Sequence, residues 1–369
     1  MKQVYFSVTN DLSGDQRVHR IISTLQKSGA SIHLIGRRLR GSHPLSSRDY
    51  STLRFRMLFN KGFLFYAFYN IRLFLYLLTR KKIDVLVAND LDTLPANYLV
   101  SRIRKTELFY DSHEYFTESP ELLNRENVKN FWLWLEKRMV PFVSHAYTVS
   151  HSIADEYNKK YEVRFGVVRN FPSPNKMANL VPIPFNPGEK KILIYQGSLN
   201  IGRGLELIID SVKGIENVIF LIVGDGDIRN KLEYYVNAES LSDKIYFMGK
   251  IPFEKLHSIT MQADAGVSFE EDLGLNYKFA LPNKLFDYIH AKIPVLVSSL
   301  PEMAGIVTDY NIGIVGGVRN VEHVRQNIRE LLFDNKKRAI WKKNLINAAN
   351  ELSWEKEEKV LLDIYFPFI

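Results

Sequence analysis

Short apolar runs alternate with helical patterns along the whole chain, and this alternation limits the fold more than any other feature. The runs read VYFSVT, SIHLIG, DVLVAND, ELFYDS and AYTVS in the first half, and KILIYQG, VIFLIVG, KIYFMG, AGVSFE, PVLVSS and IGIVGG in the second. Near-continuous apolar strands separated by helices are typical of parallel sheets that are covered on both faces. We therefore predict an α/β protein with two doubly wound domains in tandem.

The first helix shows the helical pattern most clearly. Its apolar residues follow the i, i+3, i+4, i+7 spacing of an amphipathic helix: Val18, Ile21, Ile22 and Leu25. Ser13 and Gln16 match a capping box at its start, and Gly29 is placed to end it.

The length of 369 residues suits two domains. The segment 169–191 holds five prolines and little periodicity, so it is the expected boundary. We predict a first domain at 1–169 and a second at 170–352. The last helix, within 353–369, has no strand after it and is expected to cross back onto the first domain.

Composition narrows the chemistry. The chain has no cysteine, which excludes disulfides, thiol catalysis and zinc–thiolate sites and fits a reducing compartment. The first residues lack the long apolar stretch of a signal peptide, so a cytoplasmic location is expected. The net charge is +8, and residues 37–82 hold eleven Arg or Lys and one acid, Asp49. Basic charge in one segment indicates an anionic partner, either a phospholipid surface or a nucleic acid.

The stretch 61–78, KGFLFYAFYNIRLFLYLL, is very apolar but includes Lys61 and Arg72. A spanning helix needs about 20 apolar residues, and an interior Arg is costly, so we predict a crossover helix between sheet and surface. The preceding segment interleaves basic and aromatic residues, as an interfacial membrane anchor does. Arg54, Arg56 and Lys61 are its candidate lipid-contacting residues.

A glycine-rich stretch, YQGSLNIGRGLELI, follows one predicted strand and opens a helix. Gly197, Gly202 and Gly204 would let the backbone approach a ligand closely, and Arg203 adds charge at the helix N-terminus. The pattern fits a phosphate-binding loop, and a plain βα turn is the alternative. VGDGD lacks the third glycine of a dinucleotide fingerprint, so a tight turn is expected there.

A second candidate site begins the helix in ALPNKLFDYIHAKIPVLVSS. Pro282 suits the first turn, where no N–H partner is missed. On a helical wheel, Lys284 and Asp287 lie one turn apart, opposite the apolar side chains. We therefore expect both to face away from the core, either as a solvated helix start or as a ligand site.

Two Asp-x-Asp pairs, Asp90/Asp92 and Asp225/Asp227, could hold a divalent cation, but such pairs are also common at helix starts. A denser polar cluster follows another strand, in FYDSHEYFTESPE. There His113 stands among acids at a strand end, which favours a functional cleft over a structural hydrogen bond.

These motifs resemble, in order and spacing, the retaining glycosyltransferases of family 4, which have the GT-B fold of two Rossmann-like domains. The likeness covers nearly the whole chain. GSLNIGRG resembles the family's phosphate loop, with Arg203 in the lysine position, and PNKLFDY resembles a PNKLFEY variant, with Asp287 in the glutamate position. VGDGD and the segment 245–272 follow in family order, while DSHE and NDLDTL resemble first-domain elements.

The resemblance implies that a nucleoside-diphosphate sugar binds in a cleft between the domains. Asp287 would accept hydrogen bonds from the ribose, and Arg203 and Lys284 would stabilise the diphosphate leaving group. The backbone at Gly249–Ile251 would meet the base. The other implied donor contacts are Gly14, Gly197, Ser198, Gly204, Lys250, Asn276, Tyr277, Asn283 and Leu285.

The resemblance also implies that His113 approaches the transferred sugar and that the anomeric configuration is retained. The acceptor would lie near Asp90, Asp92 and Glu114. No metal and no other cofactor is required in this class.

Two positions depart from the family pattern. Ser198 replaces the first phosphate-binding arginine, and Phe279 stands where the first glutamate of an E-x7-E pattern would fall. Glu270, Glu271 and Asp272 are close to that position but out of register, so sugar contacts are expected to shift to Asn276, Tyr277 or Lys278.

The function expected on these grounds is transfer of a sugar to an envelope, capsular or lipid-linked glycan at the inner face of the plasma membrane. A nucleotide-sugar epimerase of the same fold is the alternative, although it would leave the basic segment unexplained. A nucleic-acid-binding protein is a third candidate, but the chain has no recognisable nucleic-acid-binding motif.

Overall fold

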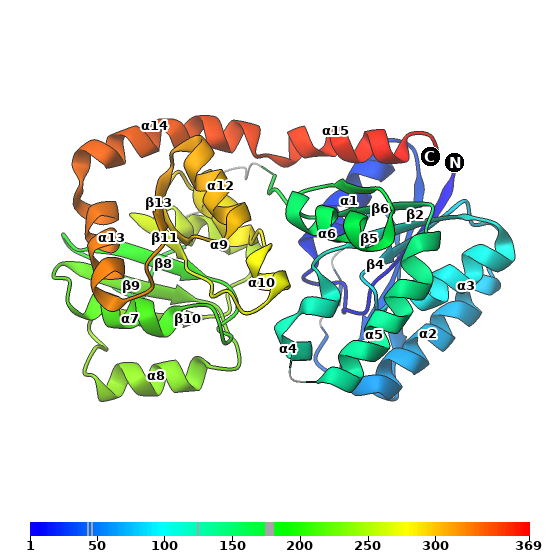
Figure 1. Ribbon diagram of the computed structural model, residues 1–369, viewed down its shortest axis with the longest axis horizontal. Coiled ribbons are helices and arrows are strands. Elements are labelled where there is room, and N and C mark those ends of the chain that lie inside the picture. Colours follow the sequence, from blue (N-terminus) through cyan, green and yellow to red (C-terminus); the bar gives the residue numbers. More distant parts are fainter. Residues whose placement is uncertain (43, 46, 124, 174–180) are drawn as a thin grey trace. The chain divides into compact units, whose positions relative to one another are not determined.

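The computed structural model describes residues 1–369 apart from 43, 46, 124 and 174–180. It divides into two compact units (Figure 1). Unit 1 consists of residues 1–170 and 357–369, and unit 2 of residues 171–356. The expected boundaries were 169/170 and 352/353, so the observed divisions lie one and four residues further along the chain.

Unit 1 is built on a parallel sheet with the strand order β3-β2-β1-β4-β5-β6-β7. Its strands are β1 (Gln3–Ser7), β2 (Ser31–Arg38), β3 (Ser51–Arg56), β4 (Val85–Asn89), β5 (Glu107–Ser112), β6 (His145–Thr148) and β7 (Phe165–Val167). Its helices are α1 (Gln16–Lys27), α2 (Gly62–Leu78), α3 (Leu94–Arg104), α4 (Pro120–Leu123), α5 (Glu126–Met139) and α6 (His151–Tyr161), with short 3-10 turns at Phe116–Glu118 and Val140–Phe142.

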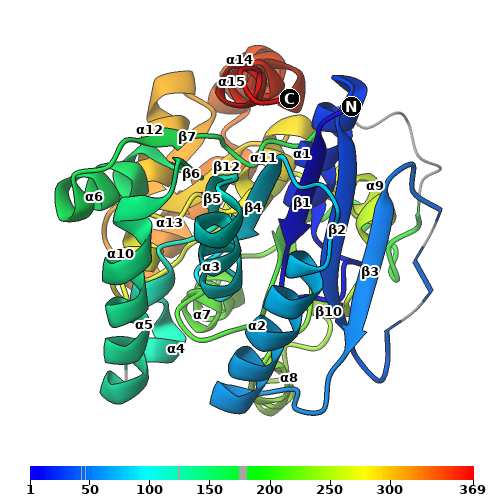
Figure 2. The same ribbon diagram turned by 90° about the vertical axis from the view of Figure 1, so that its right-hand side faces the viewer.

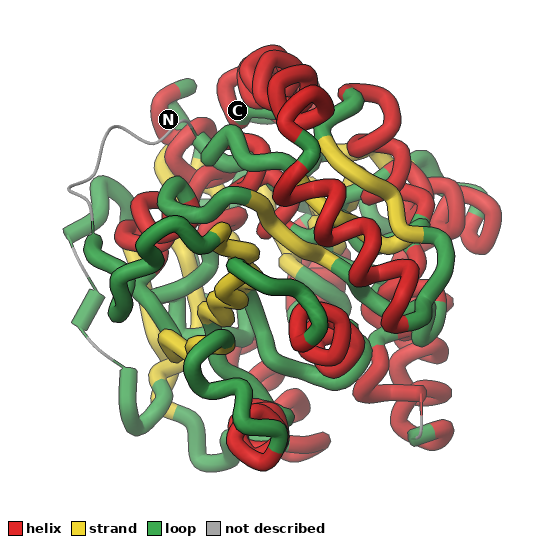
Figure 3. The backbone as a smooth tube through the Cα atoms, turned by 90° about the vertical axis from the view of Figure 1, so that its left-hand side faces the viewer, coloured by secondary structure: helices red, strands yellow, loops and turns green. Residues whose placement is uncertain are grey.

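Unit 2 is built on a second parallel sheet, with the order β10-β9-β8-β11-β12-β13. Its strands are β8 (Lys191–Gln196), β9 (Val218–Val223), β10 (Ile245–Gly249), β11 (Ala265–Ser268), β12 (Val295–Ser298) and β13 (Gly313–Gly316). Its helices are α7 (Leu205–Lys213), α8 (Arg229–Ala238), α9 (Phe253–Thr260), α10 (Leu275–Lys278), α11 (Asn283–His290), α12 (Pro301–Tyr310), α13 (Val321–Phe333) and α14 (Asn335–Glu351). Figure 3 shows the backbone with the helices and strands of unit 2 facing the viewer.

The second sheet is buried on both faces, as the apolar runs predicted. Along β8, Leu193 and Tyr195 pack into one apolar cluster, while Ile192 and Ile194 pack into another on the opposite face. This alternation follows from the two-residue period of a strand. All eleven predicted apolar runs form strands.

Two strands of unit 1 were missed. β3 lies at the sheet edge, where half-buried Arg54 and exposed Arg56 interrupt the apolar pattern, and β7 is only three residues long. The segment with Arg54 and Arg56 is therefore part of the sheet. Arg54 reaches the carbonyl oxygen of Asp11 at 3.5 Å, and the carbonyl oxygen of Arg56 accepts a hydrogen bond from Arg72 at 2.5 Å.

The first helix has the predicted buried face, but its predicted cap is wrong. Asp15 is the N-cap residue and accepts a hydrogen bond from the backbone N–H of Val18. Ser13 instead donates to Asp11 at 2.6 Å, because it lies two residues before the N-cap. Gly29 follows the C-cap with a φ of +95°, as the predicted stop requires.

The apolar stretch 61–78 forms the predicted crossover helix, α2, between β3 and β4. Phe65, Tyr69, Leu73 and Leu77 are its buried residues, spaced four apart. In the described part of the chain, no helix is both long and apolar enough to cross a membrane.

The last helix, α15 (Trp354–Tyr365), begins in unit 2 and ends in unit 1. Its Tyr365 ring stacks on Phe109 of β5, with centroids 4.3 Å apart. The Tyr365 hydroxyl is 2.9 Å from that of Tyr147 on β6, and both side chains are fully buried. These contacts make the C-terminal segment part of the core of unit 1.

In both sheets the strand order reverses once, between β1 and β4 and between β8 and β11. Connections leave opposite faces of the sheet on the two sides of such a point, and ligands of doubly wound sheets bind there, beyond the carboxyl ends of the strands. The functional residues are therefore expected after β1, β4, β8 and β11.

Candidate functional site

The switch point of unit 2 carries a buried ionic cluster. Glu270 follows β11 and is 1% exposed. Its Oε1 lies 2.8 Å from Nζ of Lys284 on α11 and 3.6 Å from Nη1 of Arg203, which precedes α7. Glu270 was not predicted as a site residue, because the family pattern places its first glutamate at Phe279, in a different register.

The expectation that Lys284 faces away from the core is wrong. Its side chain is 8% exposed, and its Nζ lies 4.0 Å from the centre of the Tyr195 ring in addition to its contact with Glu270. A carboxylate and an aromatic face replace the water that a lysine normally requires. The helical wheel failed here because Lys284 points toward the carboxyl ends of β8 and β11, where the apolar layer stops.

The charge of Glu270 is stabilised by its neighbours. Burial alone raises the pKa of its carboxyl group, but the positive charges of Lys284 and Arg203 outweigh burial and hold the pKa below its usual value. Ser268 donates a further hydrogen bond to Oε2 at 2.8 Å. The carboxylate therefore stays ionised and fixes both cations in place.

A third cation, Arg319 after β13, supports the backbone of this cluster. Its Nη1 donates to the carbonyl oxygens of Phe269 and Glu270, at 3.1 and 2.9 Å. Its guanidinium also lies 4.7 Å from the centre of the Phe269 ring. No sequence motif marked Arg319, because its role arises only when β13 is placed beside β12.

The glycine-rich loop packs closely against β11. Gly204 has a φ of +70°, and a Cβ built there would lie 2.2 Å from the carbonyl oxygen of Phe269. A side chain is thus excluded by protein backbone, independently of any ligand. This close approach carries Arg203 to Glu270, and the Arg203 guanidinium also lies 4.7 Å from the centre of the Tyr277 ring.

Asp287 lies on the same helix as Lys284 but is held differently. Its Oδ2 accepts a hydrogen bond from Nε2 of Gln196, the last residue of β8, at 2.7 Å. The Oε1 of Gln196 in turn accepts from the Thr260 hydroxyl at 2.7 Å. Gln196 therefore orients the carboxylate that the sequence assigned to ribose binding, and it was not predicted.

The other predicted donor residues of unit 2 lie in several places. Gly249 ends β10 and is followed by exposed Lys250 and half-buried Ile251, while exposed Gly197 and Ser198 follow β8. Asn276 and Tyr277 are buried on α10.

The start of α11 separates two further predicted donor residues. Asn283 begins the helix and is exposed. The side chain of Leu285 is fully buried in the core, and its backbone N–H donates to the carbonyl oxygen of Pro282 at 3.1 Å.

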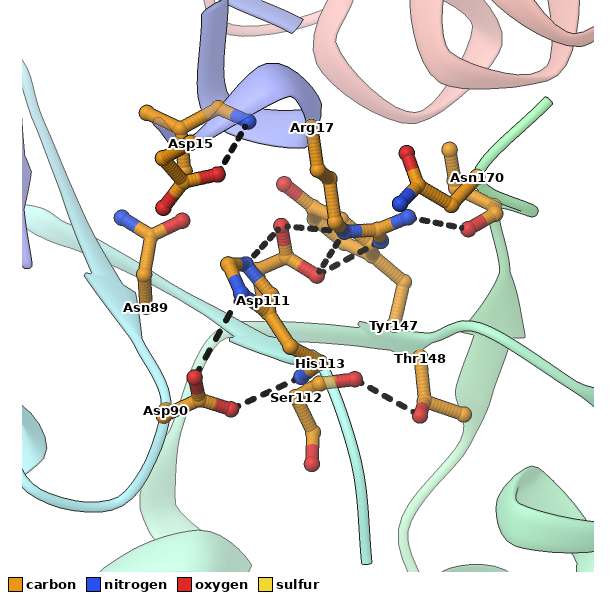
Figure 4. A network of polar contacts seen from close by, with 12 residues as sticks. Asp15, Arg17, Asn89, Asp90, Asp111, Ser112, His113, Tyr147, Thr148 and Asn170 are labelled. Atoms are coloured by element: carbon orange, nitrogen blue, oxygen red, sulfur yellow. Dashed lines mark hydrogen bonds and ion pairs between the residues drawn. The ribbon is translucent and has the colours of Figure 1, made fainter. Parts of the chain in front are cut away.

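The switch point of unit 1 carries a second buried ion pair, between Arg17 of α1 and Asp111 of β5 (Figure 4). Arg17 Nη2 and Asp111 Oδ1 are 2.7 Å apart, and both side chains are almost fully buried. Arg17 Nη1 also donates to the carbonyl oxygen of Val168 at 2.7 Å. Arg17 was read from the sequence only as part of a helix, so its role was missed.

His113 lies between two carboxylates. Its Nε2 is 3.2 Å from Asp111 Oδ2, and its Nδ1 is 3.4 Å from Asp90 Oδ2. Burial disfavours the charged ring, but Asp90 and Asp111 outweigh burial and raise the pKa of His113 to about 10. Both ring nitrogens thus carry protons at neutral pH and point toward acids, so His113 is placed to donate hydrogen bonds and not to accept a proton.

The acids after β4 are also perturbed. Burial raises the pKa of Asp90 to about 7 and that of Asp92 to about 6, although His113 opposes both shifts. Asp90 accepts a hydrogen bond from the backbone N–H of His113 at 2.8 Å, and Asp92 accepts one from the Thr9 hydroxyl at 2.5 Å.

The other predicted site residues lie in loops and are half-buried or exposed. Glu114 is half-buried beside His113, and Gly14 is exposed just before α1. Asp225 and Asp227 are exposed in the turn after β9. Within the described residues, no three acid, histidine or cysteine side chains are arranged to hold a metal ion.

Comparison with protein families agrees with this geometry. Residues 178–348 match the model of glycosyl transferases group 1, and residues 15–172 match the model of glycosyltransferase family 4. Each model matches less than half of the chain, and the two matched segments do not overlap.

Curated relatives match over part of their length. An uncharacterized glycosyltransferase of Methanocaldococcus jannaschii is 24% identical over 191 residues, which cover 49% of this chain and 52% of that protein. A second from the same organism is 25% identical over 179 residues, covering 47% and 44%. The chain spans about half the length of the curated relatives it matches.

Two solved structures match over the full chain. Sucrose-phosphate synthase from Thermosynechococcus elongatus has a TM-score of 0.79 at 15% identity, covering 100% of this chain and 99% of that one. HepE from Anabaena, in complex with UDP and glucose, has a TM-score of 0.76 at 14% identity, with both chains fully covered. At such identities the likeness shows the fold, and the predicted class of two Rossmann-like domains with parallel sheets is confirmed.

Replacing Glu270 by Gln should destabilise the chain by about 3 kcal/mol, because it leaves the buried Lys284 and the partly buried Arg203 without a counter-charge. Glu271→Gln is the matched control. Glu271 is 41% exposed and pairs with Arg319 at 3.6 Å, so its loss should cost less than about 1 kcal/mol. Urea unfolding of the two variants and the parent measures both values.

The stability difference between the parent and Glu270→Gln should also depend on pH. The folded pKa of Glu270 is lowered, so its contribution is fully present above the unfolded value of about 4.3. It is lost as the pH falls through the folded pKa. Equal stability of the parent and Glu270→Gln at neutral pH would contradict the cluster's structural role.

Proposed function

We propose that this chain is a retaining glycosyltransferase that uses a nucleoside-diphosphate sugar as donor. The observation that carries the proposal is the Lys284–Glu270–Arg203 cluster at the switch point of unit 2. One buried carboxylate holds two cations there, and an anionic ligand would balance the second charge. The group 1 family match and the UDP-containing complexes of structurally similar proteins support this ligand class.

In this proposal the cations act on the leaving group. The bond between the anomeric carbon and the β-phosphate oxygen breaks, and its electron pair stays on the phosphate. Lys284 and Arg203 stabilise that growing charge more in the transition state than in the ground state. Glu270 keeps both cations in position before the donor arrives.

The nucleoside would be held by Asp287 and by the backbone at Gly249–Ile251. A carboxylate such as Asp287 can accept hydrogen bonds from two adjacent ribose hydroxyls. Its hydrogen bond with Gln196 limits rotation of the side chain and so fixes the direction in which its second oxygen points.

The acceptor hydroxyl would attack the face that the phosphate leaves, and its proton would pass to a β-phosphate oxygen. The configuration is then retained and no metal is needed. His113, as an imidazolium, would exchange its longer contact, 3.4 Å to Asp90, for a hydrogen bond to the transferred sugar, and Asp90, Asp92 and Glu114 would line the acceptor site.

We further propose that the acceptor is an envelope, capsular or lipid-linked glycan at the inner face of the plasma membrane. The basic segment 37–82 supports this, because its charge complements anionic phospholipid.

The donor proposal predicts a stabilising ligand among UDP-, GDP-, ADP- and CMP-sugars. At 100 times its dissociation constant, such a ligand should stabilise the chain by about 2.7 kcal/mol in a thermal-shift screen. Asp287→Ala should weaken donor binding about tenfold to hundredfold, since it removes a charged hydrogen-bonding group. Arg203→Ala should mainly lower turnover, because the leaving-group charge that it stabilises grows in the transition state.

Lys231→Ala is the control, because Lys231 is a 71% exposed cation on α8. Unchanged donor binding and turnover in both site variants would show that the donor site is misplaced. Conversion of a nucleotide sugar to its epimer without an acceptor would identify an epimerase instead.

The proposed role of His113 predicts that His113→Ala lowers turnover about 10²-fold through lost positioning, with little change in donor affinity. His323→Ala, at an exposed position of α13, should leave both unchanged. Because the folded pKa of His113 is about 10, its stabilising contribution is fully present below about pH 6.5. It is lost as the pH rises through 10. Normal turnover in His113→Ala would leave His113 with a structural role only.

A further inference from the structure

Three helices of unit 1 form one layer on the sheet. Figure 2 shows α2, α3 and α5 side by side, and inter-helix contacts join α2 to α3 and α3 to α5. Aromatic pairs also join α2 to α5. The rings of Phe63 and Phe131 lie 5.6 Å apart, and those of Tyr66 and Trp132 lie 5.2 Å apart.

The outer side of this layer is unusually apolar. Six large apolar side chains on it are 37–65% exposed, and we call them together the α2–α3–α5 face: Phe63, Ile71, Leu75, Ile103, Phe131 and Trp134. Exposed apolar residues that occur singly need no explanation, whereas a set gathered on three adjoining helices marks an interaction surface.

Helix α2 carries apolar side chains both on its core side and on its outer side. Phe65, Tyr69 and Leu73 face the core, while Ile71 and Leu75 are each 57% exposed. A surface helix normally carries charged and polar residues on its outer side. The described residues of the chain therefore leave more than half of the Ile71 and Leu75 side chains uncovered.

The charge around the α2–α3–α5 face is almost entirely positive. Helices α2 and α3 contain no acid, and α5 contains Glu126, which is exposed, and Glu136, which is fully buried. Basic residues lie on the three helices and at their ends, and all of the following are exposed: Lys61, Arg72, Lys81, Arg102, Lys105, Lys137 and Arg138.

We infer that the α2–α3–α5 face rests on an anionic lipid surface. Its apolar side chains would enter the boundary between headgroups and acyl chains, and the surrounding Arg and Lys would contact lipid phosphates. The face shares Lys61 with the expected anchor, but Arg54 and Arg56 of that anchor lie on the edge strand β3 instead.

Charge and side-chain type favour lipid over other partners. A second copy of the chain would bring two basic faces together, which like-charge repulsion opposes. A nucleic acid would match the charge, but it offers no apolar surface to aliphatic side chains such as Ile71, Leu75 and Ile103.

Tryptophan fluorescence tests this inference in the unmodified chain. Of the four tryptophans, Trp134 is 53% exposed, while Trp132, Trp341 and Trp354 are at most 5% exposed. Adding vesicles of phosphatidylcholine with about one-third phosphatidylglycerol should shift the emission to the blue, and brominated acyl chains should quench it. Trp134→Phe should remove both effects. No shift and no quenching at saturating vesicle concentration would overturn the inference.

Vesicle co-sedimentation tests the aliphatic residues. Ile71→Ser combined with Leu75→Ser should weaken binding at least about tenfold, because two half-exposed apolar side chains lose their burial in lipid. The matched control combines Ile340→Ser with Ile346→Ser on α14, where the exposures are 52% and 49%, and should bind like the parent. Binding should also weaken as salt is raised.

Equal loss in both double variants would contradict the inference. So would a dimer that the α2 double variant dissociates while vesicles bind neither form, because that outcome makes the face an interface between copies. The inference deepens the proposed function, since it rests on a membrane-located acceptor. The vesicle assay contains no donor and no acceptor, so its failure would leave the donor-binding tests unaffected.

Discussion

The arrangement of unit 2 depends on one buried carboxylate, that of Glu270. A charged group without water is tolerated only beside opposite charges and hydrogen-bond donors, and Glu270 has Lys284, Arg203 and Ser268. These partners come from α11, the loop before α7, and β11, so a single carboxylate fixes three chain segments at the carboxyl ends of the strands. Removing Lys284 or Arg203 would leave part of a buried charge uncompensated, whereas binding a phosphate would add a second anion to a site already rich in positive charge.

Unit 1 also has a buried carboxylate with cationic partners near its switch point. Asp111 is the second-to-last residue of β5, and it holds Arg17 from α1 and His113 from the following loop. Burial raises the pKa of the Asp111 carboxyl, but the two cations outweigh it and hold the pKa below its usual value. In each unit a buried carboxylate near a strand end therefore fixes the positions of cationic side chains. In the proposed mechanism, Lys284 and Arg203 meet the phosphate and His113 meets a sugar hydroxyl.

The fold could be predicted from the sequence because the spacing of apolar residues directly reflects which residues are buried. Every apolar run formed a strand, and the stretch after Lys61 formed a crossover helix. The misses have physical reasons. β3 is an edge strand in which arginines interrupt the apolar pattern. Lys284 points inward because Glu270 compensates its charge. Glu270 and Arg319 could not be assigned from sequence, since each acts through contacts with a segment distant in the chain.

The most direct test of the central claim is a crystal structure of the full chain with a bound nucleoside diphosphate. The account predicts β-phosphate oxygens within about 3.2 Å of Lys284 Nζ and of the Arg203 guanidinium, with Glu270 still in contact with both cations. A diphosphate bound elsewhere, with Lys284 and Arg203 contacting only Glu270, would contradict it.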